Sequence, residues 1–244
     1  MGKRIKNGAR PLTAAAVTVA ALAVVHAGPG LTALAPVRRL FPRLAGIGEA
    51  DHVALTFDDG PDPAATPAVL ETLAEEGVHA TFFMLGSMVA KAPQLAADIA
   101  AAGHEVAVHG WDHRYTVLRT PRAVRDDMAR AKDAVAAASG ALPRFYRPPY
   151  GVLSAGALAA AHKLALRPVL WSCWGREWDA TATPGSVYET LSSGLIGGAC
   201  VLLHDSDCTS PAGSAAAARG ALPHLLAACA ASGLRVGPLG EHGL

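Results

Sequence analysis

The chain has 244 residues, a formal net charge of +1 and 51% hydrophobic residues. This length suits one domain with a full core, and the near-zero charge provides no basic surface of the kind that binds nucleic acid. The sequence also lacks a phosphate-binding loop and a dinucleotide-binding glycine pattern. We therefore expect a monomer that does not bind nucleic acid.

The N-terminus differs in composition from the rest of the chain. Four basic residues within the first ten precede an apolar run from Leu12 to Val25, and Val25-His26-Ala27 resembles a cleavage site. This pattern predicts a signal peptide or an uncleaved signal anchor over residues 1–27. Residues 28–49 contain prolines and paired arginines and are predicted to be a linker. Residues 50–244 are then expected to form the main domain, secreted or membrane-anchored on the extracellular side.

Apolar runs alternate with helical patterns along this domain. The predicted strands are Val53–Phe57, Ala80–Leu85, Glu105–Val108, Arg144–Tyr146, Pro168–Trp171, Ala199–Leu203 and Leu234–Val236. Helices are predicted between them, for example from the cap at Thr120 to the closing glycine at Gly140. About seven such units predict an α/β fold with parallel strands, arranged as a barrel, complete or incomplete, rather than as an open sheet.

Polar clusters follow five of these strands, and in α/β barrels the chemistry lies at the carboxyl ends of strands. Asp58 and Asp59 follow the first strand within the run TFDDGPD. Two adjacent carboxylates at the end of a buried strand repel each other, so a cation or a shared proton is needed to keep both. The pair indicates a catalytic site with a metal ion.

The segment His109-Gly-Trp-Asp-His113 follows the third strand and carries two histidines four residues apart. This spacing places both imidazoles on one side of a helix or turn. With one carboxylate they form a facial set that suits Zn²⁺ or another divalent transition metal such as Co²⁺. Taken alone, such a histidine pair can equally be a surface or capping feature, and the Asp pair is what favours a metal site.

Four motifs occur in order along the chain: TFDDGPD, HGWDH, RPPYG and VLLHD. Together they resemble the NodB-type polysaccharide deacetylases, the fourth carbohydrate-esterase family, over roughly Asp51 to Leu244. The resemblance implies a distorted, incomplete (β/α) barrel with about seven parallel strands. It also implies an enzyme that hydrolyses the acetamido bond of acetylated glycans.

The resemblance assigns Asp58 as the general base and Asp59, with His109 and His113, as the metal ligands. His204, in VLLHD, resembles the family's general acid, although a histidine after a strand is otherwise usually structural.

Two further assignments come from RPPYG. Arg147 resembles the family arginine that orients the base, although pairing with another buried acid is the structural alternative. The backbone N–H of Tyr150 would hold the oxyanion, as in the family.

Three positions in two motifs depart from the family pattern. The usual Asp-x-x-Asp-Trp appears here as Trp174-Gly-Arg-Glu177-Trp178. Glu177 is assigned the role of the second acid, which pairs with arginine and tunes the catalytic histidine. Gly110 stands where Ser or Thr commonly follows the first histidine, and the lost hydroxyl would loosen that loop.

These features predict a metal-dependent deacetylase acting on N-acetylated sugars of an extracellular or cell-wall glycan, of the chitin oligomer or peptidoglycan type. Two alternatives stay open: an O-acetyl esterase on acetylated xylan, and an inactive glycan-binding homologue. Among the four cysteines, Cys173 and Cys208 follow neighbouring strands and could form a disulfide, whereas Cys200 and Cys229 are expected to be buried thiols.

Overall fold

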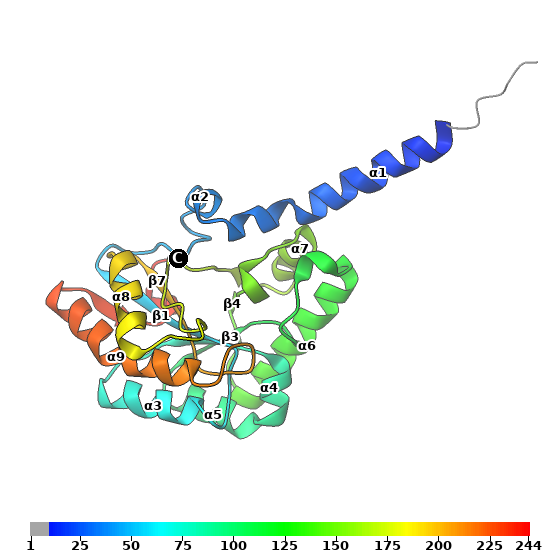
Figure 1. Ribbon diagram of the computed structural model, residues 1–244. Helices are drawn as coiled ribbons and strands as arrows, with labels where there is room; N and C mark the ends of the chain where they lie inside the picture. Colours follow the sequence, from blue (N-terminus) through cyan, green and yellow to red (C-terminus); the bar gives the residue numbers. More distant parts are fainter. Residues whose placement is uncertain (1–9) are drawn as a thin grey trace, which may run out of the picture.

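The computed structural model describes residues 10–244 and has one parallel β-sheet surrounded by helices (Figure 1). The strands are β1 His52–Asp58, β2 Thr81–Met84, β3 Glu105–Val108, β4 Phe145–Tyr146, β5 Arg167–Pro168, β6 Cys173–Trp174, β7 Cys200–His204 and β8 Arg235–Gly237. The domain helices are α3 Thr66–Glu75, α4 Gly86–Lys91, α5 Pro93–Ala101, α6 Pro121–Ser139, α7 Ala155–Lys163, α8 Pro184–Gly194 and α9 Ser214–Ala231.

The strands follow the order β5-β4-β3-β2-β1-β7-β6, and β8 pairs with the beginning of β1. Every strand pair is parallel, and no ladder joins β5 to β6 among the described residues, so the barrel is incomplete. This confirms the predicted incomplete (β/α) barrel. In the register, Asp58 lies beside both Phe83 and His204, so the carboxyl ends of neighbouring strands meet at one rim.

Local signals account for the helix ends. The side chain of Thr120 accepts a hydrogen bond from the backbone N–H of Ala123 and caps α6, and Pro121 occupies its first turn. Gly140 ends the helix with φ of 69°, a left-handed conformation that costs little for glycine. The predicted helix from Thr120 to Gly140 is therefore confirmed.

The core lies on both sides of β1, whose residues are all buried. Phe57 and Phe82, on adjacent strands, stack with ring centroids 5.1 Å apart. The alanine-rich helix α9 packs against this side of the sheet through Ala218, Ala221 and Leu222. Small helix residues let α9 approach the sheet closely.

The fifth predicted strand, Pro168–Trp171, is wrong in its second half. Only Arg167 and Pro168 pair with β4, because the N–H of Leu170 donates instead to the carbonyl of Leu44 at 2.7 Å. The chain then crosses the open side of the barrel and pairs with β7 as β6. A residue distant in sequence thus competes with the sheet for the backbone of this segment.

The disulfide suggested between Cys173 and Cys208 is not formed. All four cysteines have free thiols, with Cys173 buried and Cys208 exposed. The Sγ of Cys173 lies 3.3 Å from the carbonyl of Leu191, on α8, and burial raises the pKa of this thiol to about 12. Cys173 therefore contributes to the core.

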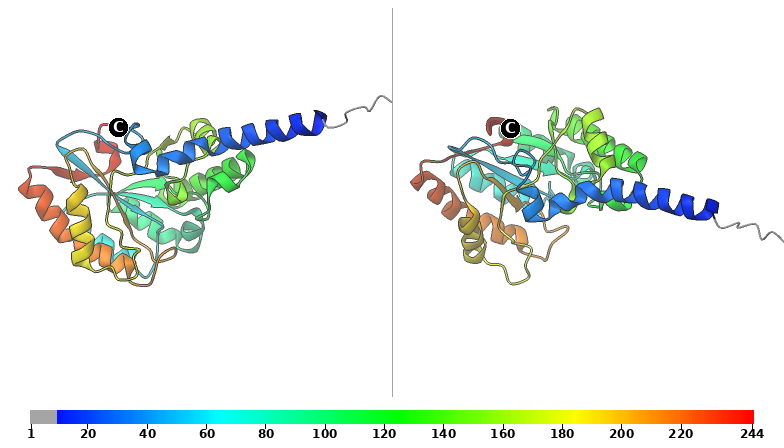
Figure 2. Two further views of the ribbon diagram at one scale, coloured as in Figure 1. Left: turned by 45° about the horizontal axis from the view of Figure 1, so that its top comes forward. Right: turned by 90° about the horizontal axis from the view of Figure 1, so that it is seen from above.

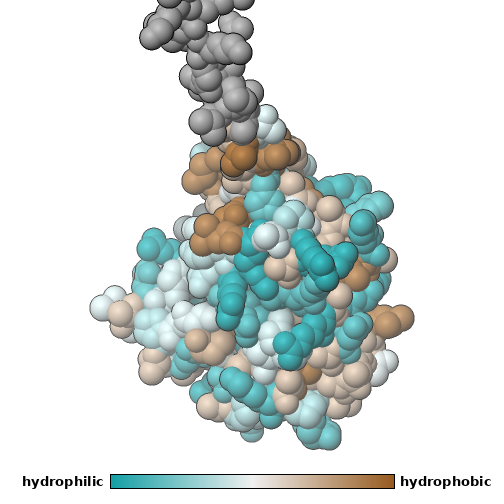
Figure 3. Space-filling view, turned by 90° about the vertical axis from the view of Figure 1, so that its right-hand side faces the viewer, coloured by the Kyte–Doolittle hydropathy of each residue, from teal (hydrophilic) through white to brown (hydrophobic). Residues whose placement is uncertain are grey.

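The first described helix, α1 Arg10–Ala27, extends away from the domain (Figure 2). The window Ala16–Ala33 is long and apolar enough to cross a membrane, and it is only 6% buried. Val17, Val19, Leu22, Val24 and Val25 are exposed, and hydrophobic side chains gather where the N-terminal region meets the domain (Figure 3).

The segment after α1 forms two short turns, η1 Gly28–Ala33 and α2 Ala35–Arg38. Thr32, Arg38 and Ala45 are buried although they belong to the stretch predicted as a linker. Gly30 lies so close to the carbonyl of Leu153 that an added Cβ would be 3.2 Å from it. Part of the segment 28–49 therefore packs on the domain.

Candidate active site

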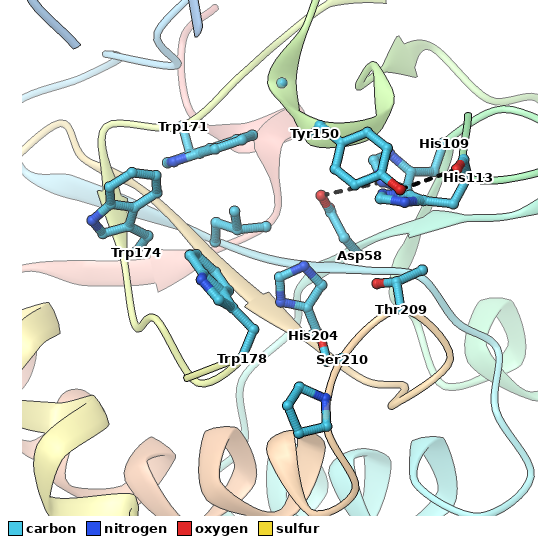
Figure 4. A pocket seen from close by; sticks show the side chains of 13 residues that line it. Asp58, His109, His113, Tyr150, Trp171, Trp174, Trp178, His204, Thr209 and Ser210 are labelled. Atoms are coloured by element: carbon cyan, nitrogen blue, oxygen red, sulfur yellow. Dashed lines mark hydrogen bonds and ion pairs between the residues drawn. The ribbon is translucent and has the colours of Figure 1, made fainter. Parts of the chain in front are cut away.

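A cavity of about 350 Å³ opens at the rim formed by the carboxyl ends of the strands (Figure 4). Most of the residues predicted for the site line it, together with aromatic residues and a loop after β7. The lining residues are Asp58, His109, His113, Tyr150, Gly151, Trp171, Trp174, Trp178, Leu202, His204, Thr209, Ser210 and Pro211. In Figure 4, Asp58 and His204 lie between the His109–His113 pair and the three tryptophans.

Asp58 is the last residue of β1 and forms a buried ion pair with Arg147. The Nη1 of Arg147 donates to Oδ1 of Asp58 at 2.7 Å and to the hydroxyl of Thr56 at 2.8 Å, and its Nη2 donates to the carbonyl of Leu170 at 2.7 Å. The guanidinium also lies 4.0 Å from the ring centroid of Phe83. The structure therefore brings together Arg147 and Asp58, and the Oδ2 of Asp58 faces the cavity side, 3.8 Å from Nε2 of His109.

Asp59 turns away from Asp58 and faces the two histidines. Its φ of 77° is in the left-handed region, which is uncommon for a residue other than glycine. Its Oδ1 lies 3.3 Å from Nε2 of His109 and 3.5 Å from Nε2 of His113. Burial alone would raise the pKa of Asp59, but the close approach of the His109, His204 and His113 rings holds it well below its usual range.

Both imidazoles direct their Nε2 atoms toward Asp59. The Nδ1–H of His109 donates to the carbonyl of Arg147 at 2.8 Å, which leaves its Nε2 lone pair directed at Asp59. Burial, followed by the charge of His109, lowers the pKa of His113 to about 4, so this ring is neutral at pH 7. Neutral imidazole is the form that coordinates metals.

The residues Asp59, His109 and His113 fit a metal ion. One ligand atom from each lies within 4.8 Å of the others. The buried Oδ1 of Asp59 has no hydrogen-bond donor among the described residues. One carboxylate oxygen and two imidazole nitrogens form the mixed donor set that a catalytic Zn²⁺ site uses.

His204, at the end of β7, is paired with Glu177. Its Nδ1–H donates to Oε1 of Glu177 at 2.7 Å, and its Nε2 lies 3.9 Å from Oδ2 of Asp59. Burial opposes protonation of the ring, but the charge and hydrogen bond of Glu177 and the charges of Asp59 and Asp58 raise the pKa of His204 to about 9. Glu177 therefore contacts the histidine as expected from the sequence, but it forms no ion pair with an arginine in the described part of the chain.

Tyr150 follows Pro148 and Pro149 in a short turn, η3 Pro149–Gly151, with φ of 59°. Its ring stacks on Tyr115 at 4.0 Å and meets His113 edge to face at 4.2 Å. The prolines and the two ring contacts fix the turn beside the histidines. The oxyanion role of its N–H stays a prediction.

Two residues that were given no catalytic or metal-binding role from the sequence have clear contacts, and those of Asp205 are the loop-capping kind expected for it. The hydroxyl of Thr209 donates to Oδ2 of Asp59 from the loop after β7. Asp205 accepts from the N–H of Gly60 at 3.1 Å and from the hydroxyl of Thr66 at 2.6 Å, which ties the end of β7 to the loop after β1. Burial raises the pKa of Asp205 to about 7. The polar stretch after VLLHD was the available signal, but it did not show which residue reaches Asp59.

The loop after β3 is held without the hydroxyl that Gly110 lacks. Gly110 has φ of 94°, a conformation that favours glycine, and the N–H of Trp111 donates to Oδ2 of Asp127 at 2.8 Å. Arg119 also pairs with Asp127. A carboxylate on α6 thus anchors the turn that carries both histidines.

The geometry defines a buried donor set for a metal, flanked by a second carboxylate and a histidine, at the rim of an incomplete α/β barrel. The family model for polysaccharide deacetylase matches residues 45–169, slightly more than half of the chain. The chain therefore belongs to the polysaccharide deacetylase family of hydrolases. The matched segment includes Asp58, Asp59, His109, His113 and Arg147, whereas Glu177 and His204 lie beyond it.

Similar proteins agree with this assignment. The chain is 37% identical over 213 residues to a chitooligosaccharide deacetylase of Bradyrhizobium sp. (strain ANU 289), covering 83% of this chain and 94% of that protein. It is 36% identical to the peptidoglycan-N-acetylglucosamine deacetylase PgdA of Listeria monocytogenes serotype 1/2a (strain 10403S), over 66% of this chain and 34% of that protein. The crystal structure of the Bc1960 peptidoglycan N-acetylglucosamine deacetylase superposes with a TM-score of 0.75 at 27% identity, covering 80% of this chain and 90% of that one.

Proposed function

We propose that this protein is a metal-dependent deacetylase that releases acetate from N-acetylated sugars of an extracellular or cell-wall glycan. The observation that carries the proposal is how the contacts divide around Asp59, His109 and His113, which we call the triad. Asp59 faces His109 and His113, while Asp58 is held by Arg147 and His204 by Glu177. The proposed base Asp58 and the proposed acid His204 thus lie beside the three residues that would hold a divalent cation.

Asp59, His109 and His113 would hold the cation, Zn²⁺ or another divalent transition metal such as Co²⁺. When bound, such an ion lowers the pKa of a water molecule and polarises an acetyl carbonyl. Asp58 would take the proton from the attacking water through its Oδ2. Arg147 holds the other oxygen at 2.7 Å, so the carboxylate has one fixed orientation.

His204 would complete the hydrolysis from the opposite side. A new C–O bond forms between the water oxygen and the carbonyl carbon, and the bond between that carbon and the sugar's nitrogen breaks. The nitrogen leaves with a proton from Nε2 of His204, because an amine is a poor leaving group without one. Glu177 keeps the ring oriented with Nε2 toward the cavity and keeps it protonated near neutral pH. The N–H of Tyr150 would stabilise the oxyanion.

The substrate class and location rest on the relatives and on α1. The two curated relatives described above are named for chitooligosaccharides and for N-acetylglucosamine of peptidoglycan. The exposed apolar face of α1 suits a signal peptide or a membrane anchor, which would place the domain outside the cell. A monomeric enzyme is sufficient, because one chain supplies the base, the acid and the three metal ligands.

The test is acetate release from chitin oligomers, peptidoglycan and acetylated xylan by metal-stripped protein reloaded with Zn²⁺ or Co²⁺. Release from an N-acetylated glycan only after reloading supports the proposal. Release from xylan alone would identify an O-acetyl esterase instead. Reloaded protein that hydrolyses none of these substrates, and no simple acetyl ester, would identify a glycan-binding homologue without catalysis.

A further inference from the structure

Three tryptophans form one wall of the cavity, and we call Trp171, Trp174 and Trp178 the tryptophan wall. Trp171 and Trp174 have centroids 5.9 Å apart, and Trp174 and Trp178 meet edge to face at 5.7 Å. Trp178 in turn meets the ring of His204 at 5.5 Å. Figure 4 shows the wall on the side of the cavity away from His109 and His113. An aromatic surface thus begins beside the proposed acid and leads away from the triad.

Trp174 is the member of the wall that is open to a ligand. It is 37% exposed, whereas Trp171 is 7% exposed. A large indole that lines a cavity and stays partly exposed offers apolar surface to a ligand. Such surfaces bind the C–H faces of pyranose rings by burying apolar surface. Trp174 is also one of the positions at which this sequence departs from the family pattern, and an acid there would offer no such apolar surface.

The wall is supported by a residue from outside the segment that the family model matches. The guanidinium carbon of Arg38, on α2, lies 5.2 Å from the ring centroid of Trp171 and 5.8 Å from that of Trp174. Both distances fall within the range of a cation–π contact. The segment containing Arg38 is itself fixed, because η1 packs beside η3 and Gly30 abuts Leu153.

Arg38 has no other strong partner among the side chains that the structure describes. It is 6% exposed, donates to the carbonyl of Ala33 at 3.2 Å and forms no ion pair with a carboxylate in residues 16–244. A buried cation without an acid is stabilised here by the indole faces. Arg39, the next residue, is exposed and contacts neither ring.

We propose that the tryptophan wall is a subsite for a second sugar ring of an acetylated oligosaccharide, and that Arg38 is a positioning residue that holds Trp171 and Trp174 in place. This deepens the proposed function and rests on it for the identity of the ligand. The ring that loses its acetyl group lies at the triad, and the neighbouring ring packs on Trp174. Substrates long enough to reach the wall then bind more tightly than a single sugar.

The kinetic test compares Trp174→Ala, Arg38→Ala, Arg38→Lys and Arg39→Ala with the unaltered chain, using N-acetylglucosamine oligomers of one to five sugars. Trp174→Ala should raise KM for the longer oligomers about tenfold, with kcat within about twofold. Arg38→Ala should raise KM about threefold, Arg38→Lys should recover part of this loss, and Arg39→Ala should have no effect. An unchanged KM for Trp174→Ala on the longer oligomers would overturn the subsite.

The role of Arg38 is isolated by the double variant of Arg38 and Trp174. If Arg38 acts through Trp174, its substitution has little further effect once Trp174 is alanine, so the two losses are not additive. Additive losses would overturn the positioning role. Circular dichroism reports folding, and if Arg38→Ala does not fold, Arg38→Lys in the same cycle answers the question.

A binding measurement separates this proposal from the proposed function. Quenching of tryptophan fluorescence by N-acetylglucosamine tetramer is recorded with metal-stripped protein, which needs no catalysis. Saturable quenching that is weakened about tenfold by Trp174→Ala supports the wall even if no acetate is released. Absence of quenching in a protein that does release acetate from the tetramer overturns the wall and leaves the proposed function intact.

Discussion

Replacing Glu177 by Gln tests whether Glu177 raises the pKa of His204, the proposed general acid. Gln has nearly the same shape and can still accept the hydrogen bond from Nδ1 of His204, but it removes the negative charge 2.7 Å away. The pKa of His204 is raised from 6.5 to about 9, and Glu177 is the largest contribution in that direction, against a burial effect that lowers it. A pKa raised from 6.5 to about 9 corresponds to roughly 3–4 kcal/mol favouring the protonated ring.

The direction of the pH effect follows from which protonation state of His204 is the active one. A general acid works while it is protonated, so activity is present below the pKa of His204 in the folded protein and is lost above it. In the Glu177→Gln variant, burial still lowers that pKa and the charges of Asp59 and Asp58 still raise it, so it returns toward 6.5. At pH 8 the protonated fraction would fall from about nine-tenths to about three-hundredths, a loss of roughly 30-fold in kcat/KM, while the loss at pH 6 would be small.

The assay is kcat/KM for acetate release between pH 5.5 and 10 in the metal-loaded enzyme. A bound cation offsets the charge of Asp59, so the comparison with Glu177→Gln isolates the contribution of Glu177. The matched control is Glu177→Asp, which keeps the charge and should keep most of the alkaline activity. A uniform loss at every pH, with the alkaline limb unmoved, would show that Glu177 only supports the fold and would refute the reasoning.

Three further changes test other parts of the structure. Asp58→Asn removes the proposed base but no metal ligand, so kcat should fall by about 10²–10⁴ while metal content by elemental analysis is unchanged; near-normal turnover would exclude the base role. Thr209→Val removes the hydroxyl that donates to Asp59, so Co²⁺ titration of metal-stripped protein should show at least about tenfold weaker binding, whereas Thr209→Ser should bind normally; equal affinities would contradict this. Gly140→Ala should destabilise the protein by about 1 kcal/mol in urea unfolding, because φ is 69° and no neighbour lies within 4 Å of the added Cβ; Gly185→Ala, which lacks a positive φ, is the control, and equal stability of both variants would be evidence against the strain argument.

The predictable part of the fold depends on short-range signals. The apolar run before Asp58 predicts a buried strand that ends at the carboxylates, and Thr120 and Gly140 mark the ends of α6 within one or two residues. The parallel direction of the strands follows because a helix connects most successive strands. Once the strand ends share a rim, the polar residues that follow them must lie close together, which is why Asp58, Asp59 and the two histidines could be placed from the sequence.

The part that could not be predicted depends on contacts between distant residues. Leu44 accepts the hydrogen bond from Leu170, and this shortens β5. Arg38 reaches two tryptophans that lie far along the sequence from it, and Thr209 reaches Asp59 across the rim. None of these contacts leaves a periodic pattern, because each depends on how a loop folds back against the barrel.

The different orientations of Asp58 and Asp59 follow from the backbone rather than from the side chains. Asp58 has strand geometry and is paired on both sides, so its carboxylate keeps the direction set by β1 and meets Arg147. Asp59 has φ of 77°, a conformation that costs about 1 kcal/mol or more for a residue with a Cβ. Two contacts offset that cost. Asp205 accepts a hydrogen bond from the N–H of Gly60, the residue after Asp59, and the thiol of Cys208 contacts the carbonyl of Asp59. The same turn that strains Asp59 directs its carboxylate to His109 and His113, so the strain and the separation of the two carboxylates have one origin.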